Sequence, residues 1–319
     1  MPLITAPYVA PEVPETPPVD VPEIGYAAIT YIDPSGTRWP MTDITADWYT
    51  LAEGVSGMGA APYTLTSDPH PRGGARLRHV QPQPRTIVWP LLVKGADHMA
   101  FTTNWRALGR AFTRTLREGP GILEVARPDG TVRWIAVYYQ SGWDGRGQTA
   151  TGITWDSAVL TLWCEDPYWV DAVPVPVHRE ADAPGDFLDP YPTVSSSQVL
   201  GDTTVNNPGD VYVWPTWLIT GPASLIEFTH RDTGEAFTLD PDASAIGHGN
   251  LLAGEQVSIR TDPPSVRYEN GDNWFGALDW PGATLWGLAP GDNRVTFTLS
   301  GSGAGSAVDL VFSPRYETA

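Results

Sequence analysis

Apolar and polar residues alternate in short runs from residue 26 onward, and clusters of turn residues separate the runs. In the first half of the chain the runs are 26–32, 86–93, 122–126, 132–139 and 158–164. Alternation with a period of two is typical of strands with one buried face. The Asp-Gly pair between the third and fourth runs predicts a hairpin. The pattern therefore predicts a mainly β region.

One segment has helical periodicity instead. Apolar residues recur at steps of three and four over residues 97–117, a spacing that predicts a helix with an apolar stripe. The stripe consists of Trp105, Leu108, Phe112 and Leu116. The following Gly-Pro-Gly is a typical helix stop. We expect the first three of these residues to pack the helix on the sheet.

A second stripe on this helix is basic, and it consists of Arg106, Arg110, Arg114 and Arg117. Such a stripe is either a solvated helix face or a contact with an acidic neighbour. Because the chain has a formal charge of −18, a second copy would supply an acidic partner. Arg106, Arg110 and Arg114 are therefore the candidate interface residues.

Two segments show neither the strand period of two nor the helical spacing of three and four. Residues 1–23 carry proline at every second to fourth position from residue 7 on, which favours an extended polyproline arm. This arm is either a solvated tail or a strap that docks on a neighbour. Residues 54–84 are rich in Gly and Pro, and we interpret them as a long exposed loop of the functional or disordered kind.

The second half of the chain predicts a separate all-β domain. Short runs of strand character recur at regular spacing after residue 206, with Gly-containing turns between them. This spacing favours a β-sandwich or jelly roll. We expect an arm over 1–23, a first domain over 24–172, a Pro-rich linker over 173–205 and a sandwich over 206–319.

Composition supports this mainly β interpretation and limits the partners. Gly and Pro number 32 each, and Trp numbers 14, too much aromatic surface for a disordered chain. Acids outnumber bases 37 to 19, which disfavours nucleic acid as the main partner. Residues 66–146 are nevertheless basic, with 12 bases against 6 acids, whereas residues 181–319 have 5 bases against 18 acids. Neither a signal peptide nor a membrane-spanning run is visible.

Catalytic and metal-binding patterns are missing from the sequence. The lone Cys164 excludes an intramolecular disulfide framework, the six His residues are scattered, and no phosphate-binding or nucleophile-elbow motif occurs. Glu165 and Asp166 are adjacent on a strand end, so they point to opposite faces and do not form an acid/base pair. We expect no cofactor, no metal and no enzymatic activity.

A group of aromatic residues in the second domain leaves two interpretations open. Trp274, Trp280 and Trp286 lie close in sequence to Asn270, Asp272 and Asn273. They either pack inside the sandwich or contact sugar rings at its surface.

Several motifs, taken in order, suggest a family. The first domain contains Gly119-Pro120-Gly121, then Arg127-Pro128-Asp129-Gly130, then Cys164-Glu165-Asp166-Pro167-Tyr168-Trp169. The second contains Trp214-Pro215-Thr216-Trp217 and Pro290-Gly291-Asp292. Over residues 25–319 this succession resembles the siphophage distal tail protein family, also called phage tail components.

This resemblance implies a structural virion protein of a tailed phage, made in the host cytoplasm. The N-terminal domain of the family is a β-structure with one helix and a hairpin-type arm, and it forms a ring, typically of six copies. The ring joins the tail tube to tail-tip and receptor-binding proteins, and the C-terminal domain is a galectin-like or jelly-roll sandwich. Asp166, Pro167, Tyr168 and Trp169 would end the last core strand and direct the chain to the sandwich. The alternative function is a carbohydrate-binding adhesin of the tail tip, which recognises a host glycan.

Overall fold

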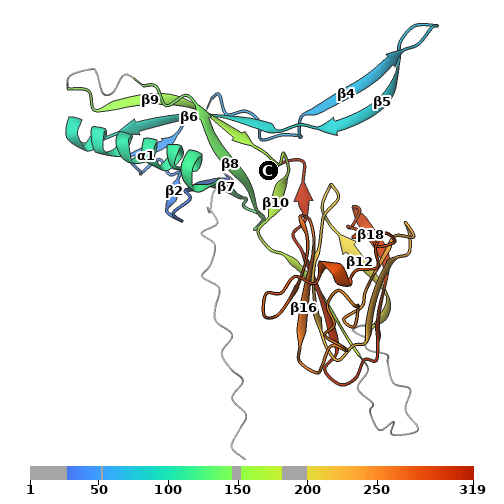
Figure 1. The fold of residues 1–319 in the computed structure, drawn as a ribbon. Helices are drawn as coiled ribbons and strands as arrows, with labels where there is room; N and C mark the ends of the chain where they lie inside the picture. The colour runs from blue at the N-terminus through green and yellow to red at the C-terminus, as the bar shows by residue number, and fades with distance from the viewer. Residues whose placement is uncertain (1–26, 52, 146–151, 182–199) are drawn as a thin grey trace, which may run out of the picture.

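The computed structural model describes residues 27–51, 53–145, 152–181 and 200–319. Figure 1 shows two β-rich bodies and a long hairpin that projects from the first of them. The expected arm over 1–23 lies outside the described residues. The described residues are mainly β with one α-helix, as predicted, and all strand pairings among them are antiparallel.

The first body is a nine-stranded sheet with a helix on one face. In spatial order its main path is β2 (Arg38–Pro40), β1 (Ala28–Ile32), β7 (Gly121–Ala126), β8 (Val132–Ser141), β9 (Trp155–Cys164), β6 (Arg85–Lys94) and β3 (Trp48–Thr50). The short strands β10 (Trp169–Asp171) and β20 (Arg315–Tyr316) extend it beside β8. On β6 and β9 buried residues alternate with more exposed ones, because only one face is covered.

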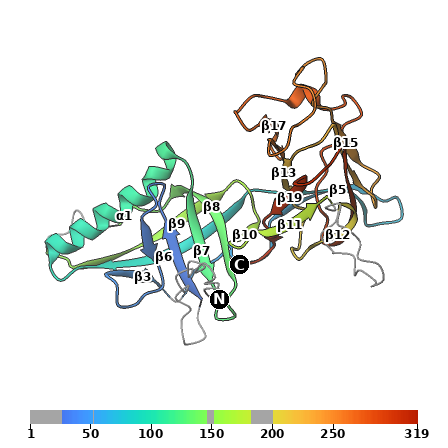
Figure 2. The ribbon, with the colours of Figure 1, turned by 90° about the horizontal axis from the view of Figure 1, so that it is seen from below.

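Helix α1 (His98–Glu118) covers that buried face (Figure 2). The side chain of Asp97 caps its first turn by accepting from the Ala100 backbone N–H at 2.7 Å. Gly119, with φ +108°, ends it in a conformation that residues with a Cβ rarely adopt. The observed helix is shifted by one residue from the predicted range.

The second body is a β-sandwich, as predicted. One sheet contains five strands, β11 (Val175–Glu180), β19 (Ala307–Phe312), β13 (Thr216–Thr220), β16 (Gln256–Thr261) and β17 (Pro264–Tyr268). The other contains β12 (Gly201–Asn207), β18 (Gly291–Ser300), β14 (Leu225–His230) and β15 (Ala236–Leu239), and the short 3-10 helix η1 (Phe275–Ala277) follows β17. Buried residues from both sheets form one core around Trp217.

The expected linker over 173–205 contains strands of the sandwich. Strand β11 pairs with β19 over its whole length, and β12 pairs with β18. Val175 and Val177 pack against the sandwich core, which explains why this Pro-containing segment is a strand. Residues 182–199 of the expected linker lie outside the described residues.

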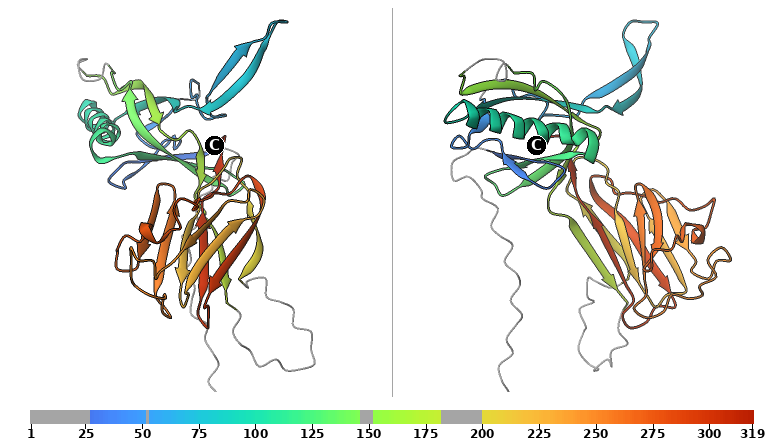
Figure 3. Two further views of the ribbon diagram at one scale, coloured as in Figure 1. Left: turned by 45° about the vertical axis from the view of Figure 1, so that its right-hand side comes forward. Right: turned by 60° about the vertical axis from the view of Figure 1, so that its left-hand side comes forward.

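A two-stranded ribbon connects the bodies. Strands β10 and β11 follow one another in the chain, as do β19 and β20. The β11/β19 pair belongs to the sandwich, whereas the β10/β20 pair belongs to the first sheet. Figure 3 shows that the C-terminal end of the chain lies at this junction. The last residues, assigned to the sandwich from the sequence, therefore belong to the first sheet.

The segment over 54–84, expected to be a loop, contains a long hairpin. Strands β4 (Tyr63–Pro69) and β5 (Ala75–Pro82) pair along their length and form a sheet of their own. Figures 1 and 3 show it extending away from both bodies. The two strands are held by backbone pairing and have no apolar core. The sequence therefore lacks the apolar run that would have identified them, and its many Gly and Pro residues suggested a loop.

Candidate assembly surfaces

The β4–β5 hairpin has one apolar and one polar face. Cross-strand partners share a face, and the pairs Tyr63 with Pro82, Leu65 with Val80 and Ser67 with Leu77 make one face largely apolar. Leu65 is 65% exposed and Leu77 is 55% exposed. A two-stranded sheet without a third layer is marginally stable in water. The hairpin therefore presents an apolar face that no second layer among the described residues covers.

The base of the hairpin is fixed by a buried arginine. Arg85 is 2% exposed, and its guanidinium donates to four backbone carbonyls. Its Nε contacts the Pro167 oxygen at 2.7 Å, and its other nitrogens contact Gly57, Gly59 and Glu317. The planar fork of arginine suits this multiple contact, which a lysine would not reproduce. Arg85 thus connects the hairpin base, the end of β9 and the C-terminal segment.

A carboxylate completes this connection. Glu317 accepts from the Ala61 backbone N–H at 2.8 Å and from the Tyr63 hydroxyl. The Tyr63 hydroxyl also lies 3.1 Å from that of Tyr168. Burial, the carboxylate and the second hydroxyl all raise the pKa of Tyr63, so its proton stays in place at neutral pH. The first residue of β4 is therefore held by both the junction and the chain end.

The Asp166–Trp169 motif forms the junction between the two bodies. Asp166 accepts two hydrogen bonds from Arg315, and the Arg315 guanidinium also lies over the Tyr168 ring at 4.7 Å. Trp169 is fully buried and begins β10, where it pairs with Tyr316. The four residues thus contact the hairpin base and the β10/β20 pair as well as the chain leading to the sandwich.

The three predicted packing residues of α1 point into the first core. Trp105, Leu108 and Phe112 are at most 2% exposed. Phe112 contacts Tyr31 of β1, whose hydroxyl donates to the Ala111 carbonyl at 3.1 Å. Leu116, the fourth residue of the predicted stripe, is 60% exposed. The buried part of the stripe therefore ends at Phe112, one turn before Leu116.

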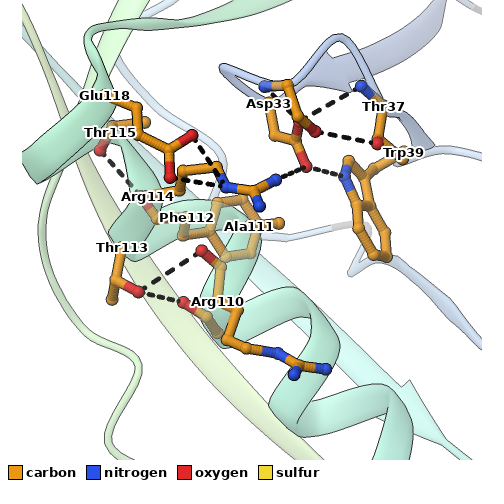
Figure 4. A network of polar contacts seen from close by, with 12 residues as sticks. Asp33, Thr37, Trp39, Arg110, Ala111, Phe112, Thr113, Arg114, Thr115 and Glu118 are labelled. Carbon is orange, nitrogen blue, oxygen red and sulfur yellow. Dashed lines mark hydrogen bonds and ion pairs between the residues drawn. The ribbon is translucent and has the colours of Figure 1, made fainter.

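The arginine stripe of α1 divides into two environments. Arg114 lies 3.1 Å from Glu118 on its own helix and 3.7 Å from the buried carboxylate of Asp33 (Figure 4). Arg106 and Arg110 are exposed, and neither has an ion pair within the described part of the chain. Only these two of the three candidate interface arginines are available to a partner.

The sheet face opposite α1 is partly apolar. Trp155 and Val159 of β9 are each 55% exposed, and Val88 and Leu92 of the paired strand β6 are half-buried. Exposed apolar side chains that lie together are typical of interaction surfaces, so this face is a candidate contact surface. The alternation in the sequence did not show that the side chains on this exposed face would be apolar rather than polar.

The expected sugar-contact residues do not form a common surface. Trp274 is 3% exposed and Trp286 is 1% exposed, and the Trp286 indole donates to the Phe228 carbonyl inside the sandwich. Only Trp280 reaches the surface, at 49% exposure, where its ring lies 5.2 Å from that of Phe275. A site made of all three tryptophans is therefore excluded, because two of them are core residues.

The described residues offer neither a reactive thiol nor a group of metal ligands. Cys164 is fully buried, and burial raises the pKa of its thiol to about 12, which keeps it protonated and unreactive. Within those residues no three His, Cys, Asp or Glu side chains are grouped to hold a metal ion. No helix of the described ranges combines the length and apolarity that a bilayer crossing requires.

Together these features define a two-body architecture: a sheet with one helix and a projecting hairpin, followed by a β-sandwich. This is the fold of phage distal tail proteins, and the resemblance expected from the sequence motifs is confirmed for the fold. The Dit protein of phage SPP1, described as a hub of the adsorption apparatus in phages of Gram-positive hosts, has this fold with a TM-score of 0.62. The two sequences are 14% identical, and the match covers 91% of this chain and 99% of that one.

Chains of the phage P2 baseplate, solved in its activated conformation with Ca or with Sr, are also similar. Each gives a TM-score of 0.54 at 10% identity and covers 92% of this chain and 100% of the other. No family model and no curated protein sequence matches the chain. At these identities the comparisons establish the fold.

Proposed function

We propose that this protein is a structural component of a bacteriophage tail: a distal tail protein whose copies form a ring between the tail tube and the tail tip. The hairpin β4–β5 is the observation that carries the proposal. It exposes an apolar face that no other segment of the described residues covers, and a neighbouring copy in a ring would cover it. The shared fold with Dit and baseplate chains supports the same role.

The first body is the ring-forming part in this proposal. Of the fourteen large apolar side chains found exposed in the described residues, ten lie at or before residue 173 and four lie after it. The sandwich would then be peripheral and would dock tail-tip and receptor-binding proteins. We propose six copies, by resemblance to the family, and tail tube protein as the partner on the opposite side.

Electrostatics support contacts between copies. The basic region over 66–146 and the acidic region over 181–319 attract one another across a subunit boundary. Arg106 and Arg110 would meet acidic residues of a neighbour, whereas Arg114 is already paired with Asp33 and Glu118. We propose a purely structural role for the protein, without catalysis or cofactor.

The hairpin face gives the test of this proposal. The triple variant Leu65→Ser/Leu77→Ser/Val80→Ser removes the apolar face but keeps the backbone pairing. We expect the assembled species of the wild type, measured by light scattering, to be replaced by the monomer. The control Thr64→Ser/Thr66→Ser/Gln81→Ser alters the opposite face and should assemble normally. Equal assembly of both variants contradicts the proposed ring contact.

Position in the particle tests the wider claim. A reconstruction of the virion should place a ring of this chain at the distal end of the tail tube, with the sandwiches outward. Density for the chain elsewhere in the particle, or its absence from the tail, would overturn the proposed function.

Sugar binding is the second candidate, and it rests on the exposed Trp280 beside Phe275. An exposed indole supported by a second ring is a suitable stacking platform for a sugar. A glycan array should show binding by the full chain that Trp280→Ala removes. No binding, or binding unchanged by that variant, rules this role out.

A further inference from the structure

A shallow groove runs along α1 on the side that carries the two available arginines. Its volume is about 590 Å³. The residues that line it include Thr103, Trp105, Arg106, Gly109, Arg110 and Trp143. The groove is thus lined by aromatic and cationic side chains, with no aliphatic side chain among these residues.

The aromatic part of the groove is rigidly built. The half-buried Trp143 stacks on the buried Trp105, with ring centroids 4.3 Å apart and 27° between the planes. Its ring occupies the space over Gly109, where a Cβ would lie only 2.7 Å from the indole nitrogen. Gly109 is therefore required in the middle of the helix, although glycine destabilises helices. An indole held in this way is a preformed binding platform.

The cationic part lacks a partner within the described residues. Arg106 and Arg110 project from the helix beside Trp143, and Figure 4 shows Arg110 directed away from the Asp33–Arg114–Glu118 network. Any ligand of this groove should therefore combine carboxylates with a shape that stacks on an indole.

One segment of the chain itself has this chemistry. Residues 7–23 contain six prolines and four acids (Glu12, Glu15, Asp20 and Glu23), with no Lys or Arg. Proline-rich segments adopt the polyproline II conformation, which aromatic-lined grooves recognise at a low entropic cost. The acids at three- to five-residue spacing add the charge that Arg106 and Arg110 would neutralise.

The extended segment is longer than the helix that it would follow. Seventeen residues of polyproline II span roughly 50 Å, against about 31 Å for the whole of α1. The first described strand, β1, lies directly under the helix, since the Tyr31 hydroxyl donates to the Ala111 carbonyl. The described part of the chain therefore begins with a strand that contacts the helix proposed as the binding surface.

We propose that residues 7–23 bind along α1 as a polyproline strap, with prolines stacked on Trp143 and acids paired with Arg106 and Arg110. This goes beyond the proposed ring, because a single chain outside any tail would also be able to close its own groove. The same contact made in a ring would tie neighbouring copies together.

Disulfide trapping in the full chain tests the strap. The native Cys164 is fully buried, so introduced cysteines react alone. In Thr16→Cys/Thr103→Cys the second cysteine lies at the groove, whereas in the control Thr16→Cys/Thr298→Cys it lies on an exposed position of β18 in the sandwich. We expect the groove pair to crosslink at least roughly ten-fold faster under mild oxidation, owing to its higher effective concentration.

Gel mobility identifies the source of the strap. A faster-migrating monomer indicates a strap from the same chain, and a dimer or ladder indicates a strap from a neighbour; both support the proposal. Adding Arg106→Gln/Arg110→Gln should lower the rate to that of the control pair, while Arg72→Gln/Arg76→Gln on the hairpin should leave it unchanged. Equal rates for the groove and control pairs in folded protein, or rates insensitive to Arg106 and Arg110, overturn the strap without affecting the proposed ring.

Discussion

The sandwich and the first body are both built from alternating strands, but they differ in which sheet faces are covered. In the sandwich the inner faces of two sheets meet, and Trp217 lies among Phe228, Phe237, Trp286 and Phe297 with ring centroids 4.8–5.9 Å apart. In the first body one sheet face is covered by α1, while the opposite face and the hairpin expose apolar side chains. The sandwich completes its core within one chain, whereas the first body leaves apolar surfaces that none of the described residues covers.

The difference shows that local pattern alone does not decide whether a strand is buried. Strands β7 and β8 form a hairpin whose residues are mostly buried or half-buried, whereas almost every residue of β4 and β5 is exposed. Both hairpins alternate, but only the first lies within a larger sheet and under a helix. Stability in one body and association in the other are therefore the quantities to perturb.

The largest effect on folding should come from the centre of the sandwich. Trp217→Ala removes a fully buried indole from an aromatic cluster, and we expect a loss of roughly 3–5 kcal/mol in the free energy of unfolding. Trp217→Phe is the matched control: it keeps a ring and also removes an indole nitrogen that has no hydrogen-bond partner. Urea unfolding compares the two variants, and equal losses would contradict the packing explanation.

A smaller loss is expected at the hairpin base. Arg85→Lys cannot satisfy the four carbonyls that Arg85 contacts, and unsatisfied buried acceptors cost about 1–3 kcal/mol. Hydrogen exchange over residues 57–61 should accelerate in the same variant. Arg72→Lys, on the exposed hairpin turn, is the control and should change neither quantity. An unchanged exchange rate in Arg85→Lys would show that this arginine does not fix the base.

On the sheet face opposite α1, substitutions should affect self-association but not the free energy of unfolding. Trp155→Ser/Val159→Ser removes two half-exposed side chains, so we expect a change in unfolding free energy of less than about 0.5 kcal/mol for each, as at other surface sites. Self-association measured by sedimentation should weaken, because the lost apolar area lies at the proposed contact. A large loss of stability with normal association would contradict the view that these side chains serve association rather than folding.

The smallest effect concerns acid stability at Asp33. Burial opposes ionisation of this carboxyl, but hydrogen bonds from Ser35, Trp39 and Thr37 prevail and lower its pKa below the usual aspartate value. The stabilisation is present above the unfolded-state pKa and is lost as the pH falls through the lower folded-state pKa. Asp33→Asn should cost roughly 1 kcal/mol near pH 7 and less at low pH. Urea unfolding between pH 3 and 7 measures this, and a pH-independent difference would exclude the carboxylate as its source.

Much of the fold was readable in the sequence where local signals and burial agree. Asp97 and Gly119 lie at the ends of α1, and the strands β14, β15 and β19 of the sandwich each coincide with a short run of strand character between turn residues. At these places apolar spacing and turn residues agree with the final packing. The fold-level resemblance followed from the order of the motifs.

The assembly surfaces were harder to predict, for physical reasons. The hairpin lacks an apolar run, and only the alternation of Tyr63 with Leu65 carried a weak strand signal. Leu77 and Val80 are three residues apart and share a face because the register shifts between Thr66 and Ser67, which no spacing rule predicts. Whether a tryptophan such as Trp274 is buried depends on which distant strand lies opposite, and a single sequence does not contain that information. The Arg85 contacts join segments up to 232 residues apart, so no local pattern identifies them.

The ribbon formed by β10–β11 and β19–β20 determines how load passes between the two bodies. The chain crosses from one body to the other twice, and strand pairing on both sides of the gap binds the crossings together. A single crossing would behave as a swivel, whereas two bound crossings behave as a strip that bends across its flat face and resists twisting. A pull on the sandwich would be shared by two covalent paths and reach the hairpin base through Glu317 and Arg85.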